Sequence, residues 1–250
     1  MDGWRQEVVS ASHVFVVGAG TTGNEIIKNL VLLGVGKITI ADFDIIEKVN
    51  LSRSVLFRDC DIGRPKATTA AERARDINPG IVIEGVDCDV IFGFGSGRYR
   101  EFNCVVTTVD NLEARMWVNR YCKLSGIPLV DTGVSGSIGN VFISSGKEGP
   151  CLECTWPESN YIRLSEKYSC LKIGEEAEIP MVITSASVVA GIAAHECVQV
   201  LHDRAQNSYV SNAGCYRWLI VPANRCGYIK IRALFTYEVP LCVALKSMTN

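Results

Sequence analysis

The sequence lacks an excess of charge of either sign. Lysine and arginine together number 25, aspartate and glutamate 27, and the formal net charge at pH 7 is −2. Proteins that bind nucleic acid usually show a basic field, and proteins that bind membrane surfaces often carry a cluster of basic residues. Because neither feature is present, we expect no nucleic-acid partner and no attachment to a membrane surface.

A long uninterrupted apolar run is also missing. Spanning a bilayer takes about 20 apolar residues, and the longest run here, Val188 to Ala194, is followed by His195 and Glu196. The first dozen residues, MDGWRQEVVSAS, have no apolar core of the kind found in a signal peptide. We expect neither a transmembrane helix nor a leader.

The eleven cysteines do not form the pattern of a disulfide scaffold. Their number is odd and the chain is long, whereas disulfide-rich scaffolds are usually short and have paired cysteines. Cys88, Cys104 and Cys197 lie in apolar stretches, where a thiol acts as a small buried hydrophobe. These features favour the reducing environment of the cytoplasm.

Apolar strands alternate with amphipathic helices through the first half of the chain. This alternation predicts an α/β fold with a doubly wound, Rossmann-like, mostly parallel sheet. From about Ser137 the pattern changes to strands in succession, which predicts an antiparallel extension of the sheet. The expected strands are 14–17, 37–41, 81–86, 104–107, 128–131, 138–144, 208–221 and 228–235, and the expected helices are 22–33, 65–76, 112–124 and 184–201.

The remaining segments suggest no second domain. The glycine-rich tract FGFGSGR at 92–98 shows no obvious chemistry and is interpreted as a connector, and 155–180 is a long polar stretch. There are no repeats and no low-complexity linker. We therefore expect one domain over residues 1–250, with a nucleotide-binding half at about 1–135.

A glycine motif follows the first strand and forms the centre of the predicted site. Gly18, Gly20 and Gly23 have the G-x-G-x-x-G spacing, and a helix is expected to start near Thr22. Such a turn lets the backbone approach a phosphate while the helix directs its N–H groups and positive dipole end at the charge. Asp42, at the end of the next strand, is placed to accept ribose hydroxyls. Alone, this pattern is typical of nicotinamide or flavin dehydrogenases.

Polar and cationic motifs that a dinucleotide site does not need follow this loop. They are Asp42-Phe43-Asp44, Asn50-Leu51-Ser52-Arg53, Gly63-Arg64-Pro65-Lys66 and, after a later apolar strand, Asp110-Asn111. Together with the glycine loop, the set resembles the ThiF/MoeB superfamily of adenylating enzymes, which are related to the ubiquitin-activating enzymes. The resemblance extends from Gln6 to about Ile231.

This resemblance implies an ATP-dependent adenylyltransferase that uses Mg²⁺. Asp42 would hold the ribose, Asn50, Arg53 and Lys66 would contact the phosphates, and Asp110 would serve the magnesium ion. Asp44 and Asn111 complete the expected cofactor-binding set, and Arg53, Lys66 and Asp110 are also the expected catalytic residues on the nucleotide side. The alternative from the residues alone is that Arg53 and Lys66 are solvated surface charges and Asp110 is a helix N-cap.

The resemblance also assigns roles to cysteines in the half at about 136–250, which would bind the carrier. Cys151 and Cys154 form a C-x-x-C pair that would supply half of a structural zinc site, and Cys226 fits a third ligand. Ile229 occupies the usual fourth position. Because zinc in structural sites takes four ligands, either Cys215 or Cys242 completes the site or the metal has been lost.

Cys170 lies in the polar stretch where family members place a catalytic thiol. It would accept the activated acyl group from AMP and form a thioester with the carrier. The alternative is a loop cysteine with no role.

The family's arginine finger, which reaches into the partner subunit's ATP site, precedes the first strand on a longer arm. Here Arg5-Gln6 aligns after that arm, so either Arg5 substitutes or the finger is absent. The resemblance implies a homodimer.

The carrier expected from the resemblance is a small ubiquitin-like or sulfur-carrier protein with a C-terminal glycine. A downstream conjugating or sulfur-transfer protein would then receive it. Two alternatives are an enzyme that adenylates a carboxylate on a modified tRNA base and a non-catalytic scaffold that binds a ubiquitin-like protein. The absence of a basic field argues against the first, and the joint presence of Asp42, Arg53, Lys66 and Asp110 argues against the second.

Overall fold

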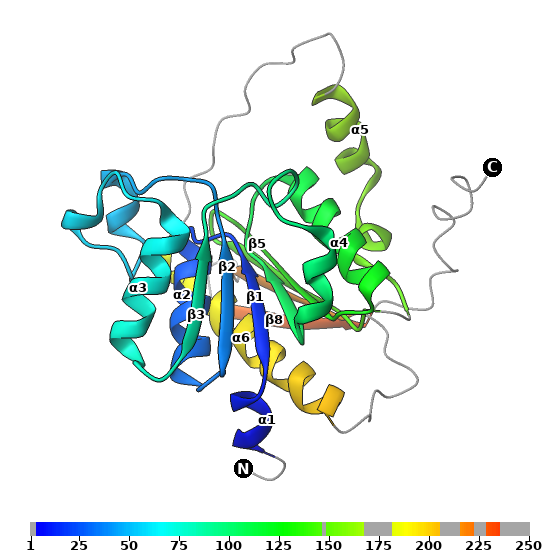
Figure 1. Ribbon diagram of the computed structural model, residues 1–250. Coiled ribbons are helices and arrows are strands. Elements are labelled where there is room, and N and C mark those ends of the chain that lie inside the picture. Colours follow the sequence, from blue (N-terminus) through cyan, green and yellow to red (C-terminus); the bar gives the residue numbers. More distant parts are fainter. Residues whose placement is uncertain (1–3, 147–148, 168–181, 206–215, 223–228, 236–250) are drawn as a thin grey trace.

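The computed structural model describes residues 4–146, 149–167, 182–205, 216–222 and 229–235. Its centre is one eight-stranded sheet in the order β3-β2-β1-β4-β5-β6-β7-β8 (Figure 1). The strands are β1 His13–Val17, β2 Lys37–Ala41, β3 Val82–Val86, β4 Cys104–Thr107, β5 Leu129–Ser135, β6 Ile138–Ser144, β7 Tyr216–Pro222 and β8 Ile229–Phe235.

The first five strands run parallel, and the last three add antiparallel neighbours. β1 pairs in parallel with β2 on one side and with β4 on the other, while β5 pairs in an antiparallel manner with β6. All five residues of β1 are buried, as expected of an apolar strand covered on both faces. The doubly wound, mostly parallel sheet with an antiparallel extension is therefore confirmed.

Helices cover both faces of this sheet. One face holds α1 Gln6–Ser10, α2 Thr21–Leu32, α3 Lys66–Ile77 and α6 Ile183–Ala205, whose apolar residues form the larger core with the sheet (Figure 1). The other face holds α4 Leu112–Ser125 and two short 3₁₀ turns, η3 Ser96–Glu101 and η4 Leu152–Thr155. Helix α5 Glu158–Lys167 follows η4, and the turns η1 Lys48–Ser52 and η2 Asp59–Asp61 lie between β2 and α3.

Helix α6 departs from the expectation that no segment reaches membrane-spanning length. Its segment Ile183–His202 is 20 residues long with a mean hydropathy of 1.3. Half of it is buried, and Val189, Ala193 and Cys197 pack in the same core as α2 and β6. By length and composition it would qualify for a membrane, but its packing is that of the core helix of a globular α/β fold.

The glycine-rich tract at 92–98 is more than the connector that the sequence indicated. Phe94 is buried and stacks on Phe15 of β1 with 4.4 Å between ring centroids. The Arg98 guanidinium lies 4.8 Å from the Phe94 ring centroid and donates to Glu84 of β3 at 2.9 Å. Among the described residues, no long helix directly follows β3 on the face of the sheet that α4 covers. The tract therefore supplies part of the apolar core on that face.

Several element boundaries differ from the expectation, among them those of β7 and α3. β7 begins at Tyr216, and residues 206–215 of the expected strand lie outside the described part of the chain. Pro65 is the N-cap of α3 with φ −60° and ψ 140°, so the helix starts one residue later than expected. Extended backbone at this position leaves Lys66 as the first helical residue.

The strand order places a topological switch point at the carboxyl edge of β1. The chain moves from β1 to β2 and β3 in one direction, and then returns across β1 to β4 and β5 in the other. At such a switch point the connections leave on opposite faces of the sheet, and ligands of open α/β sheets bind at the carboxyl ends of the strands there. The glycine loop, Asp42 and Asp110 all follow strands at this edge.

Candidate nucleotide site

The glycine loop between β1 and α2 is shaped by two close approaches. Gly18 has φ 98°, and a Cβ there would lie 2.5 Å from Thr108 Oγ1. A Cβ on Gly23 would lie 2.1 Å from the carbonyl oxygen of Gly18. Gly20 differs, because a Cβ there would meet nothing within 4 Å. Gly18 and Gly23 therefore let the turn close, whereas Gly20 leaves open space above the N-terminus of α2, as a phosphate cradle needs.

Two polar side chains that the sequence reasoning missed hold this loop. Thr108 Oγ1 donates to the carbonyl of Val17 or of Gly18, at 3.1 and 3.0 Å. Asn24, fully buried in α2, donates through Nδ2 to the carbonyls of Ala19 and Gly20 at 2.6 and 3.1 Å. The signal for Asn24 was present in the sequence, since an amide in the first turns of an otherwise apolar helix needs partners when buried.

Asp42 lies beside the glycine loop, as the sequence predicted. Its Oδ2 accepts from the Ala19 N–H at 2.6 Å and its Oδ1 from the Asp44 N–H at 2.8 Å. Burial raises the pKa of the Asp42 carboxyl above its ordinary value, and the two N–H groups together with the Lys66 charge oppose that shift. These bonds hold the carboxylate against the loop, at the position from which it can accept ribose hydroxyls.

Lys66 is held at the same edge by Asp44. Its Nζ lies 2.8 Å from Asp44 Oδ2, and its backbone N–H donates to the Asp44 carbonyl at 2.9 Å. The Lys66 side chain is 12% exposed and that of Asp44 50%. A pair with a half-exposed carboxylate is worth about 0–1 kcal/mol. The ammonium group can therefore leave Asp44 and bind a phosphate oxygen with little loss of free energy.

Asn50 and Arg53 lie on the loop that joins β2 to α3. Asn50 Oδ1 accepts from the Glu47 N–H at 2.9 Å and so caps η1. Arg53, half-buried at the end of η1, has no hydrogen-bond partner for its guanidinium among the residues that the structure describes. Asn50 thus shapes the turn, and none of the described residues occupies the guanidinium donors of Arg53.

Asp110 and Asn111 follow β4 and have different roles. Asn111 Oδ1 accepts from the Glu113 N–H at 3.0 Å and is the N-cap of α4, so the alternative that Asp110 is the cap was wrong. Asp110 is exposed at the strand end. Within the described ranges no group of three or more His, Cys, Asp or Glu residues could hold a metal. A single carboxylate still fits Mg²⁺, which usually binds one or two carboxylates together with substrate phosphates.

A buried ion pair that the sequence did not indicate braces this strand end. Asp131 of β5 is fully buried and accepts two hydrogen bonds from Arg115 of α4 and one from Thr107 Oγ1 at 2.5 Å. Burial lowers the pKa of Arg115, but the adjacent Asp131 outweighs it, so that the net shift is upward. The pair connects β4, β5 and the helix that follows Asp110.

The cysteine pair after β6 has the geometry of a zinc knuckle. The Sγ atoms of Cys151 and Cys154 lie 3.7 Å apart. Two sulfurs at about 2.3 Å from a tetrahedral zinc ion would be about 3.8 Å apart. Asn119 of α4 fixes the turn by accepting from the Leu152 N–H at 3.0 Å. The other predicted ligand, Cys226, the candidates Cys215 and Cys242, and the predicted thiol Cys170 lie outside the described residues.

Arg5 lies at the opposite edge of the sheet from the glycine loop. It precedes α1, which packs near α6 at the amino end of β1 (Figure 1). Its backbone N–H donates to His202 Nε2 at 3.0 Å, and Trp4 contacts the same ring. Within one chain, Arg5 therefore does not reach the nucleotide edge.

The chain matches the model of a protein family over most of its length. The model of the ThiF family matches residues 2–217. The chain belongs to the ThiF family. The SUMO-activating enzyme subunit 2 of Dictyostelium discoideum is 37% identical over 147 residues, 58% of this chain and 22% of that protein. The SAMP-activating enzyme E1 of Haloferax volcanii is 36% identical over 149 residues, 60% of this chain and 55% of that protein.

The chain is shorter than these relatives. The matched segments cover between 13% and 55% of the length of the curated relatives. E. coli MccB, solved with ATP, matches 95% of this chain and 68% of its own with a TM-score of 0.71 at 21% identity. Solved with AMPCPP and MccA, it gives a TM-score of 0.72 at 21% identity. This likeness establishes the fold.

Substitution by alanine is expected to have different effects at Gly20 and at Gly23. Gly20→Ala should leave the melting temperature nearly unchanged, because its methyl group meets no protein atom, and should weaken ATP binding by crowding the phosphate cradle. Gly23→Ala should lower the melting temperature strongly, because its Cβ overlaps the Gly18 carbonyl. Thermal unfolding and calorimetric titration with ATP–Mg²⁺ separate the two effects. Unchanged ATP affinity in Gly20→Ala would place the phosphates elsewhere.

Proposed function

We propose that the protein is an ATP-dependent activating enzyme that adenylates the C-terminal glycine of a small ubiquitin-like or sulfur-carrier protein. The observation that carries the proposal is that the open glycine loop, Asp42, Lys66 and Asp110 lie at one edge of the sheet. Arg53 lies on the adjoining loop, and its guanidinium has no hydrogen-bond partner in the described part of the chain. A dehydrogenase has no need of Arg53, Lys66 and Asp110. A triphosphate and its metal need all three.

The proposed reaction transfers AMP to the carrier. A carboxylate oxygen of the carrier's last glycine attacks the α-phosphorus of ATP, the bond from that phosphorus to the bridging oxygen breaks, and pyrophosphate leaves with the electron pair. Little proton transfer is required, so catalysis rests on placing the groups and stabilising the charge on the phosphates. Mg²⁺, when bound, would neutralise part of that charge.

Each polar side chain has a role that matches its chemistry. Asp42 holds the ribose, and Asp110 supplies a carboxylate to the Mg²⁺ on the phosphates. Arg53 offers a planar fork to phosphate oxygens, and Lys66 a compact charge. Lys66 is paired with Asp44 at 2.8 Å before nucleotide binds, and we propose that it moves to the phosphate. The site thus exchanges a weak surface pair for a charge-assisted contact.

The choice of carrier follows from the relatives. The curated relatives include activating enzymes for SUMO, ubiquitin and SAMP. We therefore propose a ubiquitin-like protein as the substrate class, and a sulfur carrier as a narrower proposal within that class. The net charge of −2 offers a tRNA no cationic footprint. A role as a non-catalytic scaffold does not account for the open glycine loop, nor for Arg53, whose guanidinium has no partner among the described residues.

The adenylation step can be tested at Asp110. Replacing it with Ala removes the proposed Mg²⁺ ligand without touching the helix cap, which is Asn111, so the melting temperature should change little. Exchange of radioactive pyrophosphate into ATP, measured with a glycine-terminated ubiquitin-like protein of the same organism, should fall by about 100-fold or more. Glu113→Ala, a change at a second carboxylate in the first turn of α4, is the matched control and should retain exchange. Full exchange in Asp110→Ala would mean that the metal is held elsewhere.

A thioester step is proposed at Cys170 on the strength of the family resemblance. Cys170→Ser should retain pyrophosphate exchange and lose any reductant-sensitive adduct with the carrier, because a serine hydroxyl is a far weaker nucleophile at neutral pH than a thiolate. Non-reducing and reducing electrophoresis detects the adduct. If the adduct persists in Cys170→Ser, another cysteine carries the acyl group, and Cys215 and Cys242 are the next to test.

A structural zinc ion is proposed at Cys151, Cys154 and Cys226, supported by the 3.7 Å separation of the first two sulfurs. The purified protein should contain about one zinc per chain, and Cys154→Ser should lower both the metal content and the melting temperature, since a structural site contributes folding energy directly. Cys88→Ser, at a half-buried cysteine between β3 and η3, controls for loss of a thiol. Protein that is free of zinc yet melts at the same temperature with and without chelator would leave these cysteines as packing residues.

A further inference from the structure

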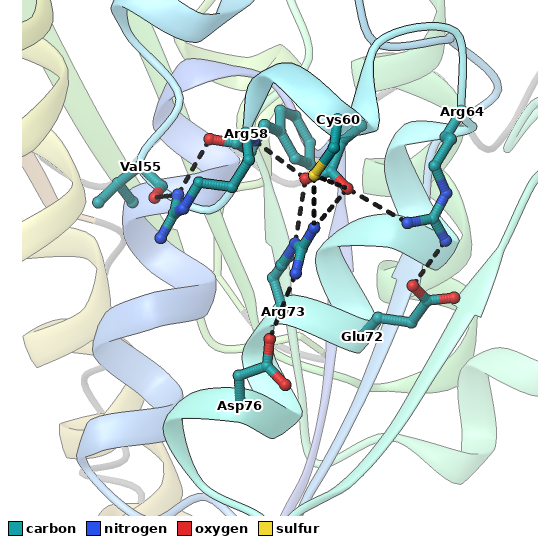
Figure 2. Close-up of polar contacts among 9 residues, drawn as sticks. Val55, Arg58, Cys60, Arg64, Glu72, Arg73 and Asp76 are labelled. Carbon is teal, nitrogen blue, oxygen red and sulfur yellow. Dashed lines mark hydrogen bonds and ion pairs between the residues drawn. The ribbon is translucent and has the colours of Figure 1, made fainter.

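The loop between β2 and α3 contains a buried carboxylate that pairs with two arginine side chains. Asp61, at the end of η2, is completely inaccessible to solvent. Figure 2 shows Arg58, Arg64 and Arg73, three arginines that donate hydrogen bonds to it, together with Cys60, Glu72 and Asp76. Arg73 of α3 donates to Asp61 through Nε at 3.0 Å and through Nη2 at 2.6 Å. Arg64 Nη1 donates at 3.2 Å, and the backbone N–H of Arg58 at 2.9 Å.

These bonds fill the acceptor positions of both carboxylate oxygens. The Arg73 hydrogen bonds lower the pKa of Asp61 below its ordinary value; burial opposes them, and the Arg58 N–H and Arg64 reinforce them. The carboxylate therefore stays charged at neutral pH. A buried charge of this kind is tolerated only when fully paired, and removing one partner is strongly destabilising locally.

Backbone contacts close this loop at its base, next to the Asp61 cluster. Ile45 and Pro65 form an isolated antiparallel bridge, the Ile46 N–H donates to the Arg64 carbonyl at 2.9 Å, and the Gly63 N–H donates to the Ile46 carbonyl at 2.8 Å. The loop within this base carries Arg53. Lys66 follows directly after the base on α3, the helix that supplies Arg73.

A series of hydrogen bonds connects Asp61 to the glycine loop. Asp61 accepts from the backbone of Arg58, and the Arg58 guanidinium donates to the carbonyls of Val55 and Phe57 at 2.8 and 2.9 Å. The Leu56 N–H, between those two carbonyls, donates to Asn24 Oδ1 at 3.0 Å. Asn24 in turn holds the glycine loop, so polar contacts connect α3, Asp61, the segment after Arg53 and the phosphate cradle.

Apolar packing fixes this loop only in part. Leu56 and Phe57 are buried in the main core, but Val49, Val55 and Ile62 are 41–56% exposed. The segment Lys48–Ser52, which leads directly into Arg53, contains no buried residue. The direction in which Arg53 points therefore depends on the polar clamp more than on the core.

We propose that Asp61 is a positioning residue for the triphosphate: by clamping the loop to α3 it presents Arg53 and Lys66 together to the phosphates. The inference rests on the proposed function, because it needs a triphosphate at the glycine loop. Asp61 touches neither nucleotide nor metal. Its effect is specific to the phosphate end of the ligand, since Asp42, which holds the ribose, is anchored separately by the Ala19 and Asp44 N–H groups.

The test compares binding of ATP–Mg²⁺ with binding of adenosine. In Asp61→Asn, an amide replaces one acceptor oxygen and places N–H groups against the donors of Arg58 and Arg73. The ATP dissociation constant, measured by calorimetry on the intact protein, should rise about tenfold or more, while that of adenosine should change less than about twofold. A general loss of structure would instead weaken both ligands together.

A matched control and a second variant keep the test decisive. Asp76→Asn removes the exposed, 3.6 Å partner of the same arginine, Arg73, and should leave both dissociation constants unchanged. If Asp61→Asn does not fold, Arg73→Lys retains the charge but loses the two-pronged contact, and it should weaken ATP several-fold relative to adenosine.

These measurements distinguish failure of the proposed function from failure of the positioning role of Asp61. If the unaltered protein binds adenosine as tightly as ATP–Mg²⁺, the proposed function fails and this inference falls with it. If the unaltered protein prefers ATP and the folded Asp61→Asn or Arg73→Lys variant retains the same preference, the positioning role is wrong while the function stands.

Discussion

The site depends on one close approach, between the α-carbon of Gly23 and the carbonyl oxygen of Gly18. A side chain on residue 23 would place its first carbon 2.1 Å from that oxygen, which no packing rearrangement of side chains can relieve because the obstacle is backbone. This approach lets α2 start directly beneath the turn, so that its N-terminus faces the space beside Gly20. The strand order adds the second condition, since it places the ends of β2 and β4 on either side of this turn.

What separates this site from a dinucleotide site is the loop after β2. In both kinds of site an acid at the end of β2 faces the ribose, and Asp42 satisfies that geometry here. The residues from Ile45 to Pro65 then form a loop whose base is closed by backbone bonds and whose carboxylate, Asp61, is buried among arginines. The loop carries Arg53, whose guanidinium has no hydrogen-bond partner among the described residues, and Lys66 follows it. In the proposed function, these two cations bind the triphosphate.

The sequence predicted most of the fold, and the reasons are local. β1 is apolar at every position because both of its faces are covered, and the glycine spacing after it admits few structures. The positions of Asp42, Lys66 and Asp110 could be inferred because each follows a strand or begins a helix at the same edge. The doubly wound, mostly parallel sheet follows from the alternation of strands and helices. The antiparallel extension followed from the strands in succession after residue 137.

The polar braces could not be predicted in the same way. Asp61 pairs with Arg73 twelve residues away, and Asp131 with Arg115 sixteen residues earlier on a different element. No periodicity marks such pairs, because each consists of single residues brought together by the tertiary fold. The alternative that made Asp110 the cap of α4 was wrong by one residue for a related reason: Asp110 and Asn111 are both good caps, and only the backbone geometry selects Asn111. The tract at 92–98 was interpreted as a connector because its one buried ring, Phe94, is hidden among glycines.

The most direct test of the account is a calorimetric comparison of two nucleotides on the intact protein, ATP with Mg²⁺ and NAD. The glycine loop and Asp42 would serve either ligand, whereas in the proposed function Arg53, Lys66 and Asp110 bind only the triphosphate and its metal. We expect measurable binding of ATP–Mg²⁺, weakened when Mg²⁺ is withheld, and no binding of NAD at the same concentrations. NAD binding equal to or tighter than that of ATP–Mg²⁺ would contradict the account.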